Sequence, residues 1–244
     1  MTYVIAMHDK TRILVTCEHG GNKIPDGYEQ YFRSALSQLE SHRGYDPGAL
    51  EMARAIAQKG NWPLVYETIS RLLVEQNRSR YRKEVFSAIS SKFSLELRTT
   101  LLETVYDPYH DKVKNILVVN DNHKMRTLHF SIHSFTPVLN GVVRNADIGL
   151  LYDPSRKEEL LVCSHVASFL RKNIPGLRIR KNYPYKGISD GLTRTMRKHF
   201  SLSRYCGIEI EINQKHYFQK NDVWQALAGV LPLCIESCSS ELFT

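Results

Sequence analysis

The stretch TLHFSIHSFTP at residues 127–137 decides the fold. Leu128, Phe130 and Ile132 alternate with polar residues, and this period of two is typical of a β-strand whose side chains point to opposite faces of a sheet. The pattern therefore predicts a central strand over Thr127–Ile132, which ends at the polar segment that follows it.

Two histidines belong to this strand and its end. If the strand persists, its period places His129, Ser131 and His133 on one face. Ligands of open α/β sheets bind outside the carboxyl ends of the strands. We therefore take His133 as the candidate for chemistry. We interpret the deeper His129 as a core histidine whose ring nitrogens are hydrogen-bonded.

Short apolar runs and amphipathic segments alternate along the rest of the chain. The further expected strands are Ile13–Cys17, Pro63–Tyr66, Arg71–Val74, Asp147–Tyr152, Leu177–Arg180 and Gly207–Ile212. The expected helices are Gly48–Lys59, Pro154–Arg171, Asp222–Leu231, and Lys83–Val118 in two pieces broken near Asp107 and Pro108. Strands separated by helices predict an α/β fold, with a mostly parallel central sheet in a three-layer αβα arrangement. Because no repeat or long linker interrupts the pattern, we expect residues 1–244 to form a single domain.

The composition indicates an ordered protein with a basic surface. The chain has 244 residues, is 42% hydrophobic and carries a net charge of +8. Such a charge is compatible with nucleic acid, an anionic membrane surface or an acidic small substrate as partner. The positive residues are scattered, and the densest run is the short stretch Arg78–Lys83. We therefore favour a solvated basic surface, part of which lines a pocket for a carboxylate, and expect neither nucleic acid nor membrane as a partner.

The cysteines and the N-terminal segment favour a reducing compartment. The five cysteines are odd in number and form no CxxC pair, unlike a disulfide framework or a zinc finger. The start, MTYVIAMHDKTR, lacks the basic region and long apolar core of a signal peptide. No apolar run approaches the roughly 20 residues that span a bilayer. We expect a cytoplasmic protein.

Two polar clusters in the first fifth of the chain could carry chemistry. In CEHGGNKIP, residues 17–25, His19 follows an expected buried strand and could be a metal ligand or a base. The alternatives are a histidine that caps a tight turn, and a phosphate cradle formed by the backbone amides of Gly20 and Gly21. In HRGYDPGA, residues 42–49, Asp46 precedes an expected helix, and taken alone it is more typical of a helix cap.

A third set of candidates comes from carboxylates and arginines. Glu209 and Glu211 alternate with isoleucines, so both point to one face of their strand. If that face is buried, they need partners or a metal site; if the strand lies at an edge, they face water. Arg78 and Arg144 could bind a carboxylate in a bidentate fork or form ordinary surface ion pairs.

Taken in order along the chain, these motifs resemble those of the N-formylglutamate amidohydrolase family. The matching blocks are HGGN-x-IP, D-x-GA, N-R, IHSFTPVLNG-x-x-R, IGLLYD, N-x-PY-x-G and E-I-N-Q. They extend from about Ile13 to about Gln214, and the segment from His133 to Asp153 is the most specific. The resemblance implies a zinc-carboxypeptidase-like α/β architecture of the phosphorylase/hydrolase-like type. It also implies metal-dependent attack of water on a small amide or formyl group.

The resemblance further implies roles for individual residues. His19, Asp46 and His133 would bind one divalent metal ion, and zinc is the expected metal because two histidines and a carboxylate suit it. Glu211 would be the general base, chosen over Glu209 because it directly precedes the isoleucine in the block that matches the family's E-I. The remaining candidates are His42 as a second catalytic residue and, for a small acidic N-acyl substrate, Asn22, Arg78, Arg144, Thr195 and His199.

The chain departs from the family pattern at two places. In the family branch whose first motif reads D-H-A-S-N-x-I-P, aspartate stands at the position of Glu18, and Ala-Ser at Gly20 and Gly21. Asn213 stands where the family usually has arginine after E-I, which removes a positive charge near the expected base. The second departure motivates an alternative from another class, a catalytically lapsed domain that binds acidic metabolites.

Overall fold

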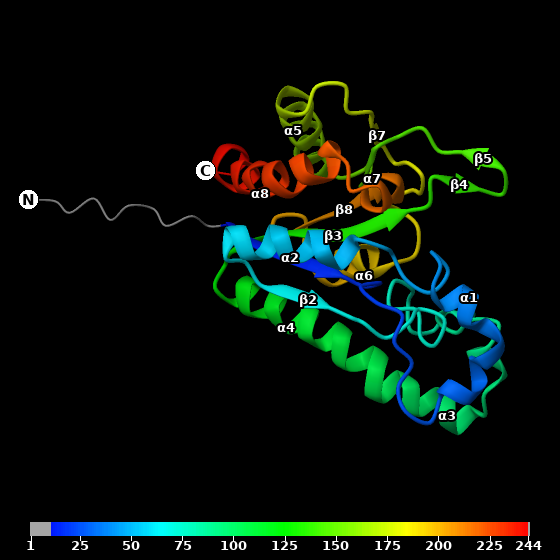
Figure 1. Ribbon diagram of the computed structural model, residues 1–244. Coiled ribbons are helices and arrows are strands. Elements are labelled where there is room, and N and C mark those ends of the chain that lie inside the picture. The colour runs from blue at the N-terminus through cyan, green and yellow to red at the C-terminus, as the bar shows by residue number, and fades with distance from the viewer. Residues whose placement is uncertain (1–10, 244) are drawn as a thin grey trace, which may run out of the picture.

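The computed structural model describes residues 11–243, whose centre is a six-stranded sheet of order β2-β1-β3-β8-β6-β7 (Figure 1). The strands are β1 (Thr11–Cys17), β2 (Leu64–Tyr66), β3 (Arg126–Phe135), β6 (Ile148–Leu151), β7 (Ile179–Lys181) and β8 (Tyr205–Asn213). β1, β2, β3 and β8 are parallel, whereas β6 runs antiparallel to β8 and parallel to β7. The mostly parallel sheet is confirmed. Residues 1–10 lie outside the described part of the chain. The structure therefore does not test the expectation that this segment is not a signal peptide.

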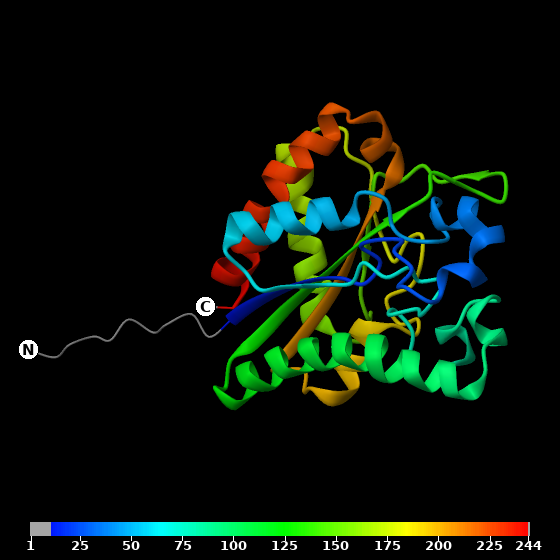
Figure 2. The same cartoon turned by 60° about the horizontal axis from the view of Figure 1, so that its bottom comes forward.

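Helices cover both faces of the sheet (Figure 1). One face packs against α2 (Ala49–Gly60), α5 (Lys157–Asn173) and α8 (Asp222–Leu242). The other packs against α6 (Leu192–His199) and α4 (Asp107–Asn122), and α4 runs along the length of that face (Figure 2). The expected three-layer αβα architecture is therefore confirmed. None of the helices within residues 11–243 is both long and apolar enough to cross a membrane.

Shorter elements complete the structure. The short helices are α1 (Leu36–Leu39), α3 (Leu95–Leu101) and α7 (Gln214–Gln219), and the ribbon β4 (Val138–Leu139) with β5 (Val142–Val143) is antiparallel. The ribbon extends from the edge of the sheet at which β3 ends (Figure 1).

The two faces of β3 differ in chemistry although both are buried. Leu128, Phe130 and Ile132 belong to the main hydrophobic core beneath α2, α5 and α8. His129 and His133 point to the opposite face, as the period of two requires. On the neighbouring strand β8 the isoleucines also join the main core, so Glu209 and Glu211 share the polar face of the sheet. The sheet thereby gathers its titratable groups on one side.

The expected strand at Arg71–Val74 is wrong, because this segment forms a turn. The backbone N–H of Leu73 donates to the carbonyl of Ser70. Leu73 and Val74 are nevertheless buried, because they pack in a second hydrophobic cluster with Phe32 and Phe93 away from the sheet. An apolar run of this length is buried in either case, so its composition alone did not distinguish a strand from a loop.

The expected helical segment Lys83–Val118 differs from the structure in where its helices begin and in the absence of a break near Pro108. Its first part consists of separate 3₁₀ turns, and the regular helix α3 begins after Ser94, whose side chain caps it by accepting from the N–H of Leu97. No break occurs at Pro108, because a π-helical turn at Leu102–Tyr106 leads directly into α4. Proline is tolerated in the first turn of a helix, where its missing N–H is not needed.

Candidate active site

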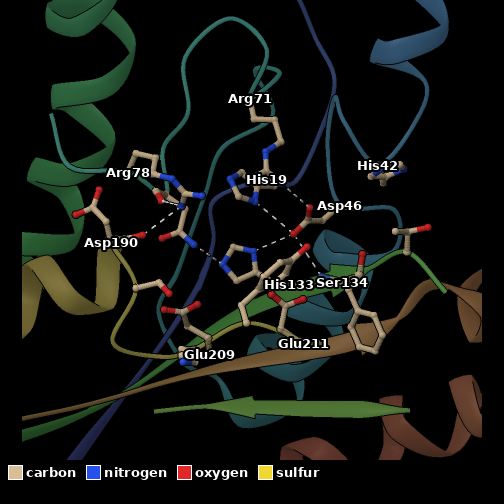
Figure 3. A pocket seen from close by; sticks show the side chains of 16 residues that line it. His19, His42, Asp46, Arg71, Arg78, His133, Ser134, Asp190, Glu209 and Glu211 are labelled. Carbon is tan, nitrogen blue, oxygen red and sulfur yellow. Dashed lines mark hydrogen bonds and ion pairs between the residues drawn. The ribbon is translucent and has the colours of Figure 1, made fainter. Parts of the chain in front are cut away.

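A pocket of about 210 Å³ opens at the carboxyl ends of β1, β3 and β8, on the polar face of the sheet (Figure 3). The segments that form it come from every part of the chain, since the loops after β1, before α2, after β2 and after β7 all contribute. Its lining residues are His19, His42, Asp46, Arg71, Asn77, Arg78, His133, Ser134, Phe135, Thr136, Tyr185, Lys186, Ser189, Asp190, Glu209 and Glu211.

Three of the expected metal ligands meet in this pocket. The Nδ1 atom of His133 lies 2.9 Å from Oδ2 of Asp46, and Nδ1 of His19 lies 3.3 Å from the same oxygen. One ligand atom from each residue lies within 4.8 Å of the other two, and all three residues are buried. Asp46 and His133 are 87 positions apart in the sequence, and together with His19 they present an N, N, O donor set to one point.

Asp46 does not cap the helix that follows it. The residue directly before α2 is Gly48, which makes no side-chain capping bond, and only the backbone carbonyl of Asp46 accepts from Ala49. The carboxylate is turned instead toward the two imidazoles, and its second oxygen accepts from Arg71 at 3.3 Å. The cap interpretation of Asp46 is therefore wrong, and the residue is free to act as a ligand.

The outer nitrogen of each imidazole is held by a further carboxylate. Nε2 of His133 lies 2.7 Å from Oε2 of Glu18, and Nε2 of His19 contacts Oε1 of Glu75. Glu75 is paired in turn with Arg71, at 2.6 Å. Metal-bound histidines commonly donate their other N–H to a carboxylate, which fixes the ring orientation.

The side chains around the two imidazoles carry more negative than positive charges. Glu18, Asp46 and Glu75 are buried, and Arg71 is the guanidinium that pairs with two of them. Burial raises the pKa of Asp46, but the His19 charge and the hydrogen bond from His133 outweigh it and hold this pKa well below its usual range. With both imidazoles neutral, as they would be when they bind a metal ion, three carboxylates facing one guanidinium leave two negative charges, which a divalent cation would balance. The donor set and the charges both fit such an ion.

Glu211 stands beside this donor set without a hydrogen-bond partner on one oxygen. Its Oε2 atom is buried and has no partner among the described residues. Burial raises the pKa of Glu211 to about 7. Two residues earlier on the strand, Oε1 of Glu209 accepts a hydrogen bond from Thr193 at 2.5 Å. Of the two glutamates, Glu211 is therefore the one with a buried oxygen that has no partner among the described residues.

His129 is a core residue, as expected. Its Nε2 lies 2.8 Å from the hydroxyl of Thr16 and its Nδ1 lies 2.7 Å from the hydroxyl of Tyr205. Burial lowers the pKa of His129 to about 4. The imidazole is thus neutral near pH 7 and fully hydrogen-bonded.

Of the basic residues that we singled out, Arg78 and His42 line the pocket and Arg144 does not. Arg78 lines the pocket, and within residues 11–243 its guanidinium donates to two backbone carbonyls, of Asn77 and Asp190, and forms no ion pair. Arg144 does not line the pocket; its guanidinium lies at the rim, 3.5 Å from the hydroxyl of Tyr185. His42 lines the pocket on the side away from Arg78 (Figure 3).

Three candidate substrate-binding residues lie outside the pocket. The amide of Asn22 donates to the carbonyl of Leu39, and the hydroxyl of Thr195 donates to the carbonyl of Gly191. His199 is exposed at the last residue of α6. None of the three lines the pocket, so their roles stay predictions; on α6 it is Thr193 that reaches a lining residue, and a position two residues later points to another side of the helix.

The glycines after His19 serve close packing. A Cβ atom on Gly20 would lie 2.7 Å from the carbonyl oxygen of Glu67, and one on Gly21 would lie 2.6 Å from that of Thr68. The amide of Gly20 also donates to Glu67 at 2.9 Å. Because that amide is already used, the phosphate-cradle interpretation of this loop is not supported.

Asn213 has a structural task at the end of β8. Its amide donates to the carbonyls of Arg144 and Ala146, at 3.0 Å and 2.8 Å. Its oxygen accepts from the N–H of Lys215 and so caps α7. The residue that replaces the family's arginine therefore holds the segment that carries Arg144.

Several lining residues were absent from our sequence-based candidates. They are Arg71, Asn77, Ser134, Phe135, Thr136, Tyr185, Lys186, Ser189 and Asp190. Six of them belong to blocks that we had quoted: Asn77 opens N-R, residues 134–136 lie within IHSFTPVLNG-x-x-R, and Tyr185 and Lys186 lie within N-x-PY-x-G. No motif in the sequence pointed to Glu75, two residues before Asn77, because only the fold brings it to His19.

Comparisons with known proteins agree with this geometry. A family model for N-formylglutamate amidohydrolase matches residues 11–218. A gene product from Agrobacterium tumefaciens is 30% identical, with a TM-score of 0.79 over 94% of this chain and 91% of that chain. The N-formylglutamate amidohydrolase from Ralstonia eutropha is 16% identical, with a TM-score of 0.71 over 93% and 92% of the two chains, a likeness of fold. No curated protein matches the chain significantly.

Proposed function

Because the chain belongs to the N-formylglutamate amidohydrolase family, we propose that it hydrolyses a small N-acyl amide of an acidic amino acid or a related carboxylate, and that it uses one divalent metal ion. The N-formyl group is the first acyl group to test. The observation that carries the proposal is the convergence of His19, Asp46 and His133 beside the unpartnered Glu211.

His19, Asp46 and His133 would hold the ion, and zinc suits two imidazoles and one carboxylate. When bound, such an ion lowers the pKa of a water molecule to roughly 7 and polarises the carbonyl of the substrate. The imidazoles are already oriented for this role, because Glu18 and Glu75 hold their outer nitrogens.

Glu211 would act as the general base and then as the general acid. Its pKa, raised by burial to about 7, lies near the operating pH, where a carboxylate can both accept and return a proton. Its unpartnered Oε2 would take the proton of the attacking water and then deliver it to the leaving nitrogen, so that the amine departs neutral. Glu209 is less suited, because Thr193 already occupies its Oε1.

Arg78 would place the substrate. It lines the pocket and forms no ion pair within residues 11–243, so its guanidinium can accept a carboxylate in a bidentate fork. Such an anchor would hold the scissile amide beside Glu211 and supply much of the orientation that speeds the reaction. His42 lies on the other side of the pocket and would face the opposite end of the substrate (Figure 3).

The test combines metal analysis with a substrate screen. Purified protein is analysed for bound metals, dialysed against a chelator, and assayed with N-formyl and N-acetyl amino acids before and after Zn²⁺ is returned. We expect turnover of an acidic N-acyl amino acid that is lost with the metal and restored by Zn²⁺. Stoichiometric binding of such a compound without any turnover would instead favour the lapsed metabolite-binding domain.

A further inference from the structure

We propose that Glu18 is a positioning residue: it holds His133 in the tautomer that leaves Nδ1 free to bind a metal ion, and its negative charge strengthens that binding. This inference rests on the proposed metal site but concerns a residue outside the donor set. Glu18 directly follows β1 and is 1% exposed. The three groups that contact its carboxylate come from two different elements, α4 and β3.

The hydrogen bonds around Glu18 require an ionised carboxylate. Oε1 accepts from the hydroxyl of Tyr109 at 2.7 Å, and Oε2 accepts from the hydroxyl of Ser131. The same Oε2 lies 2.7 Å from Nε2 of His133. With both oxygens accepting, the carboxylate has no proton of its own to donate. Nε2 of His133 also lies 3.4 Å from the amide nitrogen of Asn77, but the contact with Glu18 is much the shorter, so the proton of this contact resides on Nε2.

This placement decides the chemistry of the opposite ring nitrogen. A neutral imidazole carries one N–H, so a proton on Nε2 leaves a lone pair on Nδ1. In His133 the Nδ1 atom faces Oδ2 of Asp46, 2.9 Å away, and a proton holds the two atoms together until a metal ion takes its place. Two electron-rich atoms at this distance repel one another unless a cation or a proton lies with them. By holding the proton on Nε2, Glu18 thus prepares Nδ1 of His133 and Oδ2 of Asp46 to bind a cation together.

The outer nitrogen of His19 also contacts a carboxylate, but that carboxylate is neutralised by an arginine. Its Nε2 contacts Glu75, but Glu75 is ion-paired with Arg71 at 2.6 Å. Glu18 has no such cation: within residues 11–243 its ion-pair partner is His133 alone, and its other contacts are neutral hydroxyls. The full charge of Glu18 therefore acts on His133 and on whatever His133 binds. Outer carboxylates of this kind raise the basicity of a ligating imidazole.

Glu18→Gln separates the charge from the shape. Glutamine keeps the size of the side chain and can still accept from Nε2, but it carries no charge. The matched control is Glu236→Gln, the same chemical change at an exposed position on α8. The measurement is the dissociation constant for Zn²⁺ in competition with a chromogenic chelator, per folded protein as judged by circular dichroism. We expect Glu18→Gln to weaken Zn²⁺ binding by about 10–100-fold and Glu236→Gln to leave it unchanged.

Tyr109→Phe provides a second variant that keeps the charge. Phenylalanine fills the same space but removes the donor to Oε1, while Ser131 and His133 still hold Oε2. We expect a loss of Zn²⁺ affinity smaller than that of Glu18→Gln. An equal or larger loss would overturn the assignment of the effect to the charge of Glu18. If Glu18→Gln does not fold, a loss of about 10–100-fold in Tyr109→Phe, which keeps the charge, overturns the assignment as well.

A spectroscopic measurement tests the tautomer directly. Long-range ¹H–¹⁵N correlation spectra of the Zn²⁺-loaded parent protein should show the His133 proton on Nε2; a proton on Nδ1 would overturn the inference. Failure of the inference differs from failure of the proposed function. Zn²⁺ binding that Glu18→Gln leaves unchanged overturns the inference alone, whereas a parent protein that binds no divalent metal ion contradicts both.

Discussion

His133 on β3 lies directly opposite Glu211 on β8 in the register of the sheet. Neighbouring strands are about 4.8 Å apart, and side chains at paired positions point to the same face. The imidazole that we propose as a metal ligand and a carboxylate with an unpartnered oxygen are therefore held side by side by backbone hydrogen bonds rather than by flexible loops. The same register pairs Ser131 with Glu209, one step further from the pocket mouth.

Replacement of Asp46 tests the donor set. Asp46→Asn keeps the shape of the side chain but removes its charge, so we expect Zn²⁺ affinity to fall by more than the roughly 10–100-fold typical of residues behind the ligands. Elemental analysis and chelator competition measure the change. Asp26→Asn, at an exposed position, is the matched control. Full metal content in Asp46→Asn would remove Asp46 from the donor set.

Glu211 and Glu209 should differ in their effect on turnover. Glu211→Gln cannot take a proton, and a positioned base contributes about 10²–10⁴-fold to rate, so we expect kcat to fall by that factor with metal content intact. Glu209→Gln should mainly lower stability, because it disturbs the hydrogen bond with Thr193. Steady-state kinetics and metal analysis of both variants measure kcat and metal content and so distinguish the two glutamates. The reverse pattern would identify Glu209 as the base.

Arg78 should discriminate between acidic and neutral substrates. Arg78→Ala removes the lining guanidinium, so we expect KM for an acidic N-acyl substrate to rise by at least about tenfold, the loss of a charged hydrogen bond of 1.5–3 kcal/mol. A neutral amide analogue should be little affected. Arg144→Ala at the rim should have a smaller effect, and Arg33→Ala, at an exposed position, should have none. Equal losses for acidic and neutral substrates would mean that Arg78 is structural.

His129 should make the fold sensitive to acid. Burial lowers its pKa to about 4 in the folded protein, whereas an unfolded histidine titrates near 6.5. Between these values the unfolded chain binds more protons, so stability is present above about pH 6.5 and is lost as the pH falls toward 4. From pH 7 to pH 5 this amounts to about 2 kcal/mol for one histidine.

Urea unfolding of the metal-free parent and of His129→Gln at both pH values measures this contribution. The parent should lose more stability on acidification than the variant does. If both proteins lose the same amount, His129 does not titrate in the way that its burial requires.

The sequence identified the elements with the strongest periodicity. The strands β3 and β8 and the helices α2 and α5 lie where alternation and amphipathic spacing predicted them. The segment at residues 71–74 failed, because an apolar run records burial but not the partner against which it packs. The length of α4 and the π-helical turn before it were likewise missed, since neither has a local sequence signal.

By itself, the sequence determined which residues are the main candidates for chemistry: the order of its motifs singled out His19, Asp46, His133 and Glu211. Only the tertiary structure decided which carboxylates stand behind them, because Glu18 and Glu75 reach the imidazoles through contacts between residues far apart in the chain. It also placed Thr195 and His199 outside the pocket lining, although they share a helix with Thr193. Local patterns specify strands and their faces, whereas the convergence of side chains on one point depends on how those strands are ordered and which loops close over their ends.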